Sequence, residues 1–359
     1  EAEEATDHLV DQLNSMPPFE FWGGPMSTRR FKFSESSNAK GAWANKASDF
    51  TDEIHIGPPV GQSEQSGKLD DIVNLFSERY ETLRKVLRQE WGFKELTSIS
   101  EVRKDKQVFR NRKFNMIGIV SDIRRTKSGG RMVQLEDKTG IMGVFIGKEN
   151  PAIDTLLPDD VIGVKGNFLK DSDLFLVDYV QFPEFLDTPR KMGSEFDPVS
   201  VAFASDIHIG SKYFLEKEWD KMTQWLNSDH PVANNIKYMV FSGDVCDGIG
   251  IYPGQEQNLT ETDVYLQYEE FARKLDLFPD HITPVILPGN HDAVRPAEPQ
   301  PVLESTVQKK FNSAIHTGNP ARINLSGIDV LSYHGKGIDD MVPRMAHVTY
   351  EKPAEAMKE

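Results

Sequence analysis

The sequence predicts a chain of several domains, in which a small domain of β-strands precedes a larger α/β domain. Five short strand-like runs, separated by Gly, Lys, Asp and Ser, lie between residues 113 and 182. From residue 199 onwards, apolar runs typical of buried strands alternate with helical stretches, which indicates an α/β sheet. The length of 359 residues is also more than a single domain usually holds.

The composition is that of an ordinary globular protein, with 38% hydrophobic and 27% charged residues. No run approaches the ~18–20 apolar residues of a membrane span, and the acidic N-terminus lacks the features of a signal peptide. We therefore expect a cytoplasmic protein without membrane contacts. The single cysteine, Cys246, excludes a disulfide framework within the chain. A net charge of −15 argues against nucleic-acid binding over the whole surface but suits bound divalent metal ions or a basic partner.

The N-terminal part of the chain is expected to be irregular up to residue 68, because no helix or strand period persists there. Its aromatic residues, such as Phe19, Phe21 and Trp22, leave open whether this acidic arm orders on a partner or is a flexible linker. Residues 69–110 are expected to be a helical connector. Its first part, residues 69–91, is the clearest helix, with apolar side chains recurring along one face.

Residues 111–182 are expected to form an OB-fold, a small five-stranded barrel, because a helical break after the third strand-like run matches that layout. Such barrels often bind single-stranded nucleic acid. The candidate contacts are the basic residues around the first hairpin, namely Arg124, Arg125, Lys127 and Arg131. The alternative is a structural barrel with a solvated basic turn, since few aromatic residues accompany these charges. Residues 183–198 contain Pro and Gly and read as a linker.

The α/β domain, residues 199–359, has a polar cluster directly after each of four apolar runs. These runs are residues 199–204, 236–241, 282–287 and 328–333, and they are followed by "SDIH", "SGD", "GNHD" and "HG". Ligands of α/β sheets bind at the carboxyl ends of the strands. We therefore expect six side chains to meet at one rim: Asp206, His208, Asp244, Asn290, His291 and His334. Any one cluster alone would be a weak signal, because such residues are also common in turns and caps.

The residue types at this rim indicate a metal site. Carboxylate, imidazole and amide ligands together suit cations such as Mn²⁺, Fe²⁺ or Zn²⁺. Asp206 and His208 are two residues apart and can bind the same ion, whereas Asp244 can reach two ions. Two metal ions roughly 3.5–4 Å apart can cleave phosphate esters, because they activate water and balance charge on the phosphate oxygens.

The order of these motifs resembles that of the calcineurin-like metallophosphoesterase superfamily. Four stretches are more specific and closely resemble the small subunits of archaeal family D DNA polymerases: "SDIHIGSKYF", "GDVCDGIGIYPGQEQNL", "LPGNHDAVRPAEPQP" and "SYHGKGIDDMV". The OB-like region before the phosphoesterase domain supports this resemblance, which covers residues 100–359. It implies a calcineurin-like α/β sandwich and a proofreading 3′→5′ exonuclease that works beside a large polymerase subunit.

The resemblance also implies roles for the site residues. Asp206, His208 and Asp244 would hold a first divalent ion, and Asp244, Asn290 and His334 a second. The ions would be Mn²⁺, with Fe²⁺, Zn²⁺ and Mg²⁺ as alternatives. His291 would be the general acid for the leaving 3′ oxygen or would stabilise the phosphate, and Asp292 would orient His291. DNA with a 3′ end would be the substrate, and a sliding clamp is a further candidate partner.

The sequence departs from the superfamily pattern at its end. The last superfamily motif, Gly-His-x-His, supplies one ligand to each metal, but His347 stands in "MAHVTY" without that context. We therefore expect the phosphoesterase domain to be C-terminally incomplete. Two other functions stay open: a non-catalytic scaffold for the large subunit, as in related eukaryotic subunits that have lost most ligands, and a stand-alone phosphoesterase acting on a small phosphodiester or a phosphoprotein.

Overall fold

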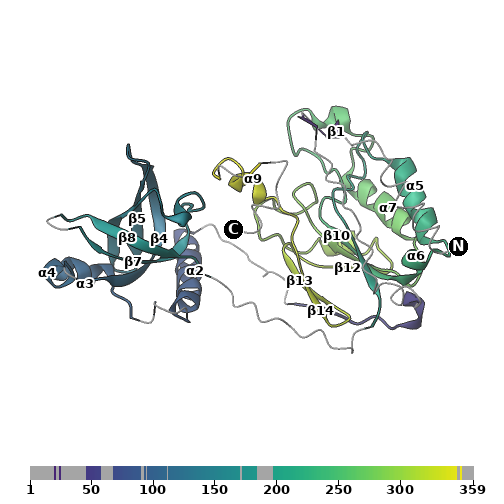
Figure 1. Ribbon diagram of the computed structural model, residues 1–359. Helices are drawn as coiled ribbons and strands as arrows, with labels where there is room; N and C mark the ends of the chain where they lie inside the picture. Colours follow the sequence, from purple (N-terminus) through teal and green to yellow (C-terminus); the bar gives the residue numbers. More distant parts are fainter. Residues whose placement is uncertain are drawn as a thin grey trace. The chain divides into compact units, whose positions relative to one another are not determined.

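The computed structural model divides the chain into two compact units (Figure 1). The first comprises Glu1–Ser63 and Lys191–Gly337, and the second comprises Glu64–Arg190 and Ile338–Glu359. The structure describes residues 20–21, 24–25, 46–57, 68–89, 93, 95–110, 112–169, 172–183, 197–345 and 348–349. The side chains of Phe19, Phe21 and Trp22 lie outside the described part, so the expectation that they anchor a partner stays a prediction.

The first unit is built on a parallel sheet with the strand order β12-β11-β10-β9. Its strands are β9 (Ser200–Ala204), β10 (Ile236–Ser242), β11 (Thr283–Leu287) and β12 (Ile315–His316). The first three are the strands expected from the sequence, whereas the short β12 was not expected. Because β9, β10 and β11 are parallel, their carboxyl ends lie at the same edge of the sheet.

Layers of different kinds cover the two faces of the parallel sheet. Met239 and Phe241 of β10 pack with Trp219 and Phe271 on one face. The two aromatic partners belong to helices α5 (Glu216–Leu226) and α7 (Val264–Leu275). On the other face, Tyr238 and Val240 of β10 pack against a second sheet. This alternation reflects the period of two along a strand that is buried on both sides. Short helices α6 (Pro231–Asn235), η4 (Gln255–Asn258) and α8 (Ser305–Gln308) complete the unit.

The second sheet has the order β14-β13-β3 and corrects two expectations. Its strands are β3 (Ile54–Ile56), β13 (Ala321–Leu325) and β14 (Ile328–Ser332). The run at 328–333 is therefore not a buried strand of the parallel sheet. It pairs antiparallel with β13 through a two-residue turn, Ser326 and Gly327, whose φ values of 44° and 84° are typical of a tight hairpin.

The other correction concerns residues 46–57, which were expected to be part of an irregular arm. They contain the short helix η2 (Ala47–Asp49) and β3, which pairs with β13. Lys237 fixes the segment through an ion pair with Asp52, with 2.8 Å between Nζ and Oδ1. The backbone N–H of Glu53 also donates to the Tyr238 hydroxyl at 3.0 Å. Because these contacts join residues far apart in the sequence, no local sequence pattern predicts them. The strands β1 (Glu20–Phe21) and β2 (Gly24–Pro25) form a separate antiparallel pair.

The second unit contains a closed five-stranded barrel with the order β4-β5-β6-β8-β7. Its strands are β4 (Phe114–Arg125), β5 (Arg131–Asp137), β6 (Gly140–Ile146), β7 (Val161–Phe168) and β8 (Phe175–Gln181). The expected five strands are thus present, and the short helix η3 (Pro151–Ile153) lies between the third and the fourth. The barrel core contains fully buried side chains from each strand, among them Met116, Leu135, Ile146, Ile162 and Phe175.

Helices flank this barrel in sequence: α2 (Leu69–Gln89), α3 (Ile99–Lys104), α4 (Lys106–Phe109) and α9 (Ile338–Met341). The second half of α2 packs Tyr80 and Leu87 against Phe93 and the barrel strands. The first half exposes its apolar side chains, namely Leu69, Ile72, Val73, Leu75 and Phe76. The expected apolar face of α2 is therefore covered only in its second half. Among the described residues, no helix has both the length and the apolar content needed to cross a membrane.

Candidate metal centre

Three polar residues at the carboxyl edge of the parallel sheet have unusual backbone conformations. Asp206, His208 and Asp244 have φ values of 57°, 53° and 52°. Residues other than glycine rarely adopt this left-handed conformation, which costs about 1–3 kcal/mol each and is concentrated at functional sites. Backbone hydrogen bonds hold the loops in place, from Asp206 N to Gly243 O and from His208 N to Asp244 O, both at 3.0 Å. The surrounding structure thus fixes three candidate ligands against their backbone preference.

The first group of candidate ligands contains Asp206, His208 and Asp244. Asp206 and His208 come from the loop after β9, and Asp244 comes from the loop after β10. His208 Nε2 lies 3.8 Å from Asp206 Oδ1 and 3.9 Å from Asp244 Oδ2. These three side chains therefore point to a common position.

The second group contains Asp244, Asn290 and His334. His334 Nε2 lies 3.3 Å from Asp244 Oδ2 and 3.1 Å from Asn290 Oδ1. His334 follows β14, in the second sheet, yet it reaches the carboxyl edge of the first sheet. It is held there because its ring Nδ1 bonds Ser242 O at 2.9 Å and its backbone N–H donates to Asn319 Oδ1 at 2.9 Å. Asp244, which is only 3% exposed, is shared by both groups.

The three histidines of the site are oriented in the same way. His208 Nδ1 lies 2.8 Å from Asp247 Oδ1, His334 Nδ1 lies 2.9 Å from Ser242 O, and His291 Nδ1 lies 2.8 Å from Asp247 O. Each partner is an oxygen acceptor, so each Nδ1 carries the proton. The Nε2 atom of a neutral ring is then an unprotonated acceptor, which is the form that binds a metal ion.

The carboxylates of the site attract positive charge strongly. Burial lowers the pKa of His208, but hydrogen bonds that its ring donates to the carboxylates of Asp206 and Asp247, with the charge of Asp244, outweigh burial and raise this pKa to about 10. For His334, burial again lowers the pKa, and the hydrogen bond and charge of Asp244 raise it to about 9. The centre therefore favours a bound cation, either a proton on each ring or a metal ion.

The donor atoms fit two divalent ions that share Asp244. Ligand atoms that are each about 2.1 Å from one ion lie roughly 3–4 Å apart, and the four separations above are 3.8, 3.9, 3.3 and 3.1 Å. A neutral His334 also turns an acceptor nitrogen toward the acceptor oxygen of Asn290. Two acceptors in contact need a cation between them, either a proton on the ring or a metal ion, and a metal ion would also join Asp244 at the same position.

His291 lies directly beside the candidate ligands. Its backbone N–H donates to Asp244 Oδ1 at 2.8 Å, and its ring packs edge-on against the ring of His208 with centroids 4.7 Å apart. It is thus placed next to the metal positions while its Nδ1 is bound by Asp247. This position agrees with the expected role of a proton donor or phosphate contact, which stays a prediction.

The structure replaces the expected orienting residue of His291. Asp292 was expected to orient His291, but its carboxylate accepts from Gly289 N at 2.8 Å and from the Tyr268 hydroxyl at 2.9 Å. Among the described contacts, none joins Asp292 to the His291 ring. Asp247, which sequence reasoning missed, orients both His208 and His291. The only signal in the sequence was a second aspartate, three residues after Asp244, in a glycine-rich loop.

The predicted basic cluster of the barrel is less free than expected. Arg131 is largely buried, with a side chain 13% exposed that bonds the carbonyl of Ile153. Arg124 is exposed but pairs with Asp122 at 2.7 Å. Arg125 and Lys127 are exposed. The hairpin therefore offers fewer cations to a nucleic acid than four basic residues suggest.

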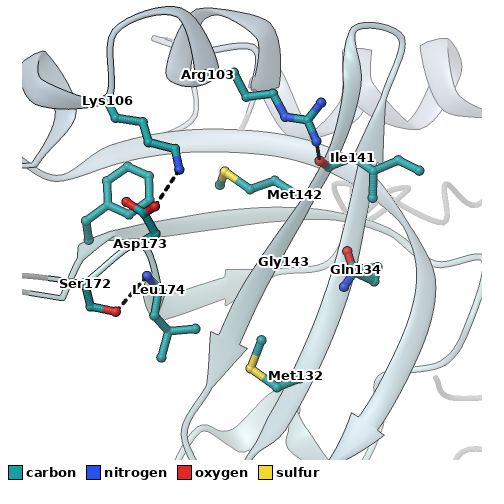
Figure 2. Close-up of a pocket in the computed structure, with 11 residues that line it drawn as sticks. Arg103, Lys106, Met132, Gln134, Ile141, Met142, Gly143, Ser172, Asp173 and Leu174 are labelled. Carbon is teal, nitrogen blue, oxygen red and sulfur yellow. Dashed lines mark hydrogen bonds and ion pairs between the residues drawn. The ribbon is translucent and has the colours of Figure 1, made fainter.

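A cavity of about 490 Å³ lies on the outer surface of the barrel (Figure 2). Its lining includes Met132 and Met142 and a rim that contains Arg103 and an ion pair between Lys106 and Asp173, with 3.1 Å from Nζ to Oδ2. Asp173 also pairs with Arg110 at 3.3 Å. The one carboxylate among its lining residues, Asp173, is thus already paired with cations, so the cavity offers no group of metal-ligating side chains.

The chain is similar to a known family and to several curated archaeal proteins. Residues 199–354 match the family of calcineurin-like phosphoesterases. Three curated archaeal proteins, each called DNA polymerase II small subunit, are similar to most of the chain. The protein of Methanocaldococcus jannaschii is 38% identical over 91% of this chain and 56% of its own length. That of Archaeoglobus fulgidus is 37% identical over 84% and 60%, and that of Methanothermobacter thermautotrophicus is 35% identical over 87% and 65%. The chain thus spans 56–65% of the length of these relatives.

Proposed function

We propose a function from two similarities: residues 199–354 match the family of calcineurin-like phosphoesterases, and most of the chain is similar to archaeal DNA polymerase II small subunits. From this premise we propose that the protein is the small subunit of a two-subunit archaeal replicative DNA polymerase and removes nucleotides from DNA 3′ ends. The observation that carries the proposal is the buried Asp244, which lies within 3.3 Å of His334 and 3.9 Å of His208 and so links two ligand groups.

The two groups would hold two divalent ions. Asp206, His208 and Asp244 are the ligands of one ion, and Asp244, Asn290 and His334 are the ligands of the other. Mn²⁺ is the proposed metal, with Fe²⁺, Zn²⁺ and Mg²⁺ as alternatives, because the donors are a mixture of carboxylate, imidazole and amide oxygen. When bound, such a pair of ions activates water and neutralises charge on the scissile phosphate.

His291 supplies the proton-transfer step. Its Nδ1 is bound to the carbonyl oxygen of Asp247 at 2.8 Å, and the Asp247 carboxylate lies 3.9 Å from the same nitrogen. A protonated Nε2 can donate to the 3′ oxygen as that oxygen leaves the phosphate. Asp247 therefore takes the orienting role in this proposal.

The test combines metal analysis with a nuclease assay on purified protein. We expect two bound Mn²⁺ ions per chain and stepwise shortening of 5′-labelled single-stranded DNA, but no shortening of the same DNA with a blocked 3′ end. Asp244→Asn is expected to lose both ions and the activity. If the protein binds no metal and leaves DNA intact, the non-catalytic scaffold becomes the better reading, and hydrolysis of a small diester in preference to DNA would favour a stand-alone phosphoesterase.

We also propose a scaffold role toward the large polymerase subunit, favoured by the exposed first half of α2. Leu69 is 74% exposed and Val73 is 53% exposed, although both lie on an apolar helix face. Surface patches of this kind mark interaction sites. Ile72→Glu and Phe76→Glu are expected to weaken co-purification of the large subunit, whereas Val108→Glu, at an exposed position of α4, is the control. Equal binding by all three variants would contradict this contact.

We propose further that the barrel is an OB-fold. The strand order, the single parallel pair β6–β8 and the helix η3 after the third strand support this assignment. Residues 111–182 would be this domain, residues 199–359 the phosphoesterase domain, and 1–68, 69–110 and 183–198 the segments outside them. Arg125 and Lys127 are the proposed DNA contacts of the barrel, and a sliding clamp is a further proposed partner. Charge reversal at both residues should weaken DNA binding.

A further inference from the structure

Exposed apolar side chains lie on the loops that follow β9 and β10. Tyr213 is 64% exposed, Ile249 41%, Ile251 38% and Tyr252 37%. We call Tyr213, Ile249, Ile251 and Tyr252 the apolar shelf. A stable loop that keeps two tyrosines and two isoleucines in water loses the benefit of burying them. Such groups are typical of surfaces that bind another molecule.

Buried hydrogen bonds fix the loop after β10, which carries Ile249, Ile251 and Tyr252. Gln255 and Gln267 are both fully buried. The Gln255 side chain donates to Asp247 O at 2.8 Å and accepts from Ile251 N at 2.9 Å. The Gln267 side chain accepts from Gly248 N at 2.9 Å and donates to Glu261 O at 2.8 Å. The exposed side chains therefore project from a fixed platform.

The shelf adjoins the metal centre. A Cβ atom on Gly248 would lie 2.2 Å from the carbonyl oxygen of His291 and 3.3 Å from Ile251 Cδ1, so the loop packs directly on the backbone of His291. Asp247, at the start of this loop, orients His208 and His291. The loop is thus joined to the groups that are proposed to cleave the phosphodiester.

The two tyrosines belong to one connected surface. Asn258 bridges them, because its Oδ1 accepts from the Tyr213 hydroxyl at 3.4 Å and its Nδ2 donates to the Tyr252 hydroxyl at 3.2 Å. The exposed Lys212 lies at the same place and donates to the carbonyl of Gln257. Two rings, two aliphatic side chains and one cation together match a nucleobase with its phosphate.

We propose that the apolar shelf stacks the terminal bases of a single-stranded nucleic acid and so positions its last phosphodiester at the metal centre. This inference rests on the proposed function and names the residues that select the substrate. The net charge of −15 gives little general attraction for phosphates. Stacking on aromatic rings supplies affinity that is independent of base sequence, which suits an exonuclease that must remove any terminal nucleotide.

The experiment compares two substrates with the same protein and Mn²⁺. One is a single-stranded oligonucleotide, and the other is bis(p-nitrophenyl) phosphate, which lacks bases. Loss of one stacked base is worth about tenfold in binding. For Tyr213→Ala and Tyr252→Ala we expect kcat/KM on DNA to fall at least tenfold more than kcat/KM on the small diester, mainly through KM. Tyr213→Phe and Tyr252→Phe keep the ring and are expected to stay within about twofold of the wild type on DNA.

Binding of a fluorescent oligonucleotide in the presence of a chelator provides a readout that is independent of catalysis. The alanine variants should bind it about tenfold more weakly than the phenylalanine variants. An unchanged KM and unchanged binding in both alanine variants would overturn the proposal, and so would equal losses on DNA and on the diester. Loss of a protein partner with unchanged DNA binding would also overturn it. If the wild type hydrolyses neither substrate, the proposed function fails, and the binding measurement still decides the shelf.

Discussion

Replacement of Tyr268 by phenylalanine tests the new role of Asp292. The Tyr268 hydroxyl is fully buried, donates to Asp292 Oδ1 at 2.9 Å and accepts from Ala293 N at 2.9 Å. Tyr268→Phe removes this one oxygen and keeps the ring in the core. It leaves the backbone N–H of Ala293 without its partner and takes one donor away from a carboxylate that is 3% exposed.

The lost hydrogen bond to Asp292 sets the magnitude. A hydrogen bond to a charged group contributes ~1.5–3 kcal/mol. The N–H of Ala293 belongs to an exposed residue and can bond water instead, so it adds little. Asp292 keeps the Gly289 N–H at 2.8 Å, so we expect a loss of about 2 kcal/mol in unfolding free energy. This loss corresponds to a fall in Tm of roughly 4–8 °C for a domain of about 150–250 residues.

The same substitution should have a pH dependence of known sign. Burial raises the pKa of Asp292 to about 6, and the Tyr268 hydroxyl opposes this rise. Since the folded pKa lies above the unfolded value near 3.9, ionisation of Asp292 costs stability as the pH rises through about 6. Without the hydroxyl the ionised form is stabilised less. The variant should therefore lose more stability at pH 8 than at pH 5.

The assay is thermal and urea unfolding of the wild type and the variant in a metal-free buffer with a chelator. Tyr265→Phe is the control, because Tyr265 lies on the same helix and is 46% exposed. We expect the control to stay within ~0.5 kcal/mol of the wild type. Two results would refute this role of Asp292: a fall in Tm of less than about 2 °C in Tyr268→Phe, or an equal loss of unfolding free energy at pH 5 and pH 8.

Three further predictions concern the centre and its surroundings. Asp247→Ala removes the acceptor of His208 Nδ1 and should weaken Mn²⁺ binding, measured by calorimetry, about 10–100-fold. Asp247→Asn keeps an acceptor and should have a smaller effect. If Asp247→Ala binds Mn²⁺ as tightly as the wild type, the orienting role of Asp247 is contradicted. Gly289→Ala places a Cβ atom 2.2 Å from Oδ1 of Asp244 and should abolish metal binding. Gly147→Ala, which has open space around it, is the control and should have no effect. If Gly289→Ala still binds metal, the close packing of Gly289 on Asp244 is contradicted. Burial lowers the pKa of His316 to about 4, so the unfolding free energy should fall as the pH drops from about 6.5 to 4, by up to ~1.4 kcal/mol per pH unit. His316→Phe should remove this dependence on pH. If the variant keeps the same dependence, the ring is not buried in its neutral form.

The sequence predicts which residues share one edge of the sheet, but it does not predict which residues orient them. The strands before Asp206, Asp244 and Asn290 are visible as apolar runs, and their shared edge follows from the topology of a parallel sheet. The role of Asp247 is not visible, because an aspartate beside a glycine reads as a turn residue until the fold brings His208 and His291 to it.

The errors in the fold have different physical origins. The hairpin of β13 and β14 carries a signal that could have been found, since Ser326 and Gly327 separate two apolar runs by two residues. β3 could not have been found, because a three-residue strand has no detectable period and its partner is far away in the sequence. The burial of Arg131 is equally non-local, since it depends on the carbonyl of Ile153 in η3.

The pairing of β3 with β13 has a consequence for synthesis of the protein. Ile56 pairs with Ile323, so the two partners are 267 positions apart in the sequence. At about 5–20 residues per second, β3 leaves the ribosome roughly ten seconds to one minute before its partner strand exists. The whole barrel is made in this interval, and its five strands pair only with one another. The three-stranded sheet, in contrast, can pair β3 only after β13 has been made. A nascent-chain experiment should therefore find the barrel resistant to protease while residues 54–56 are still cleavable.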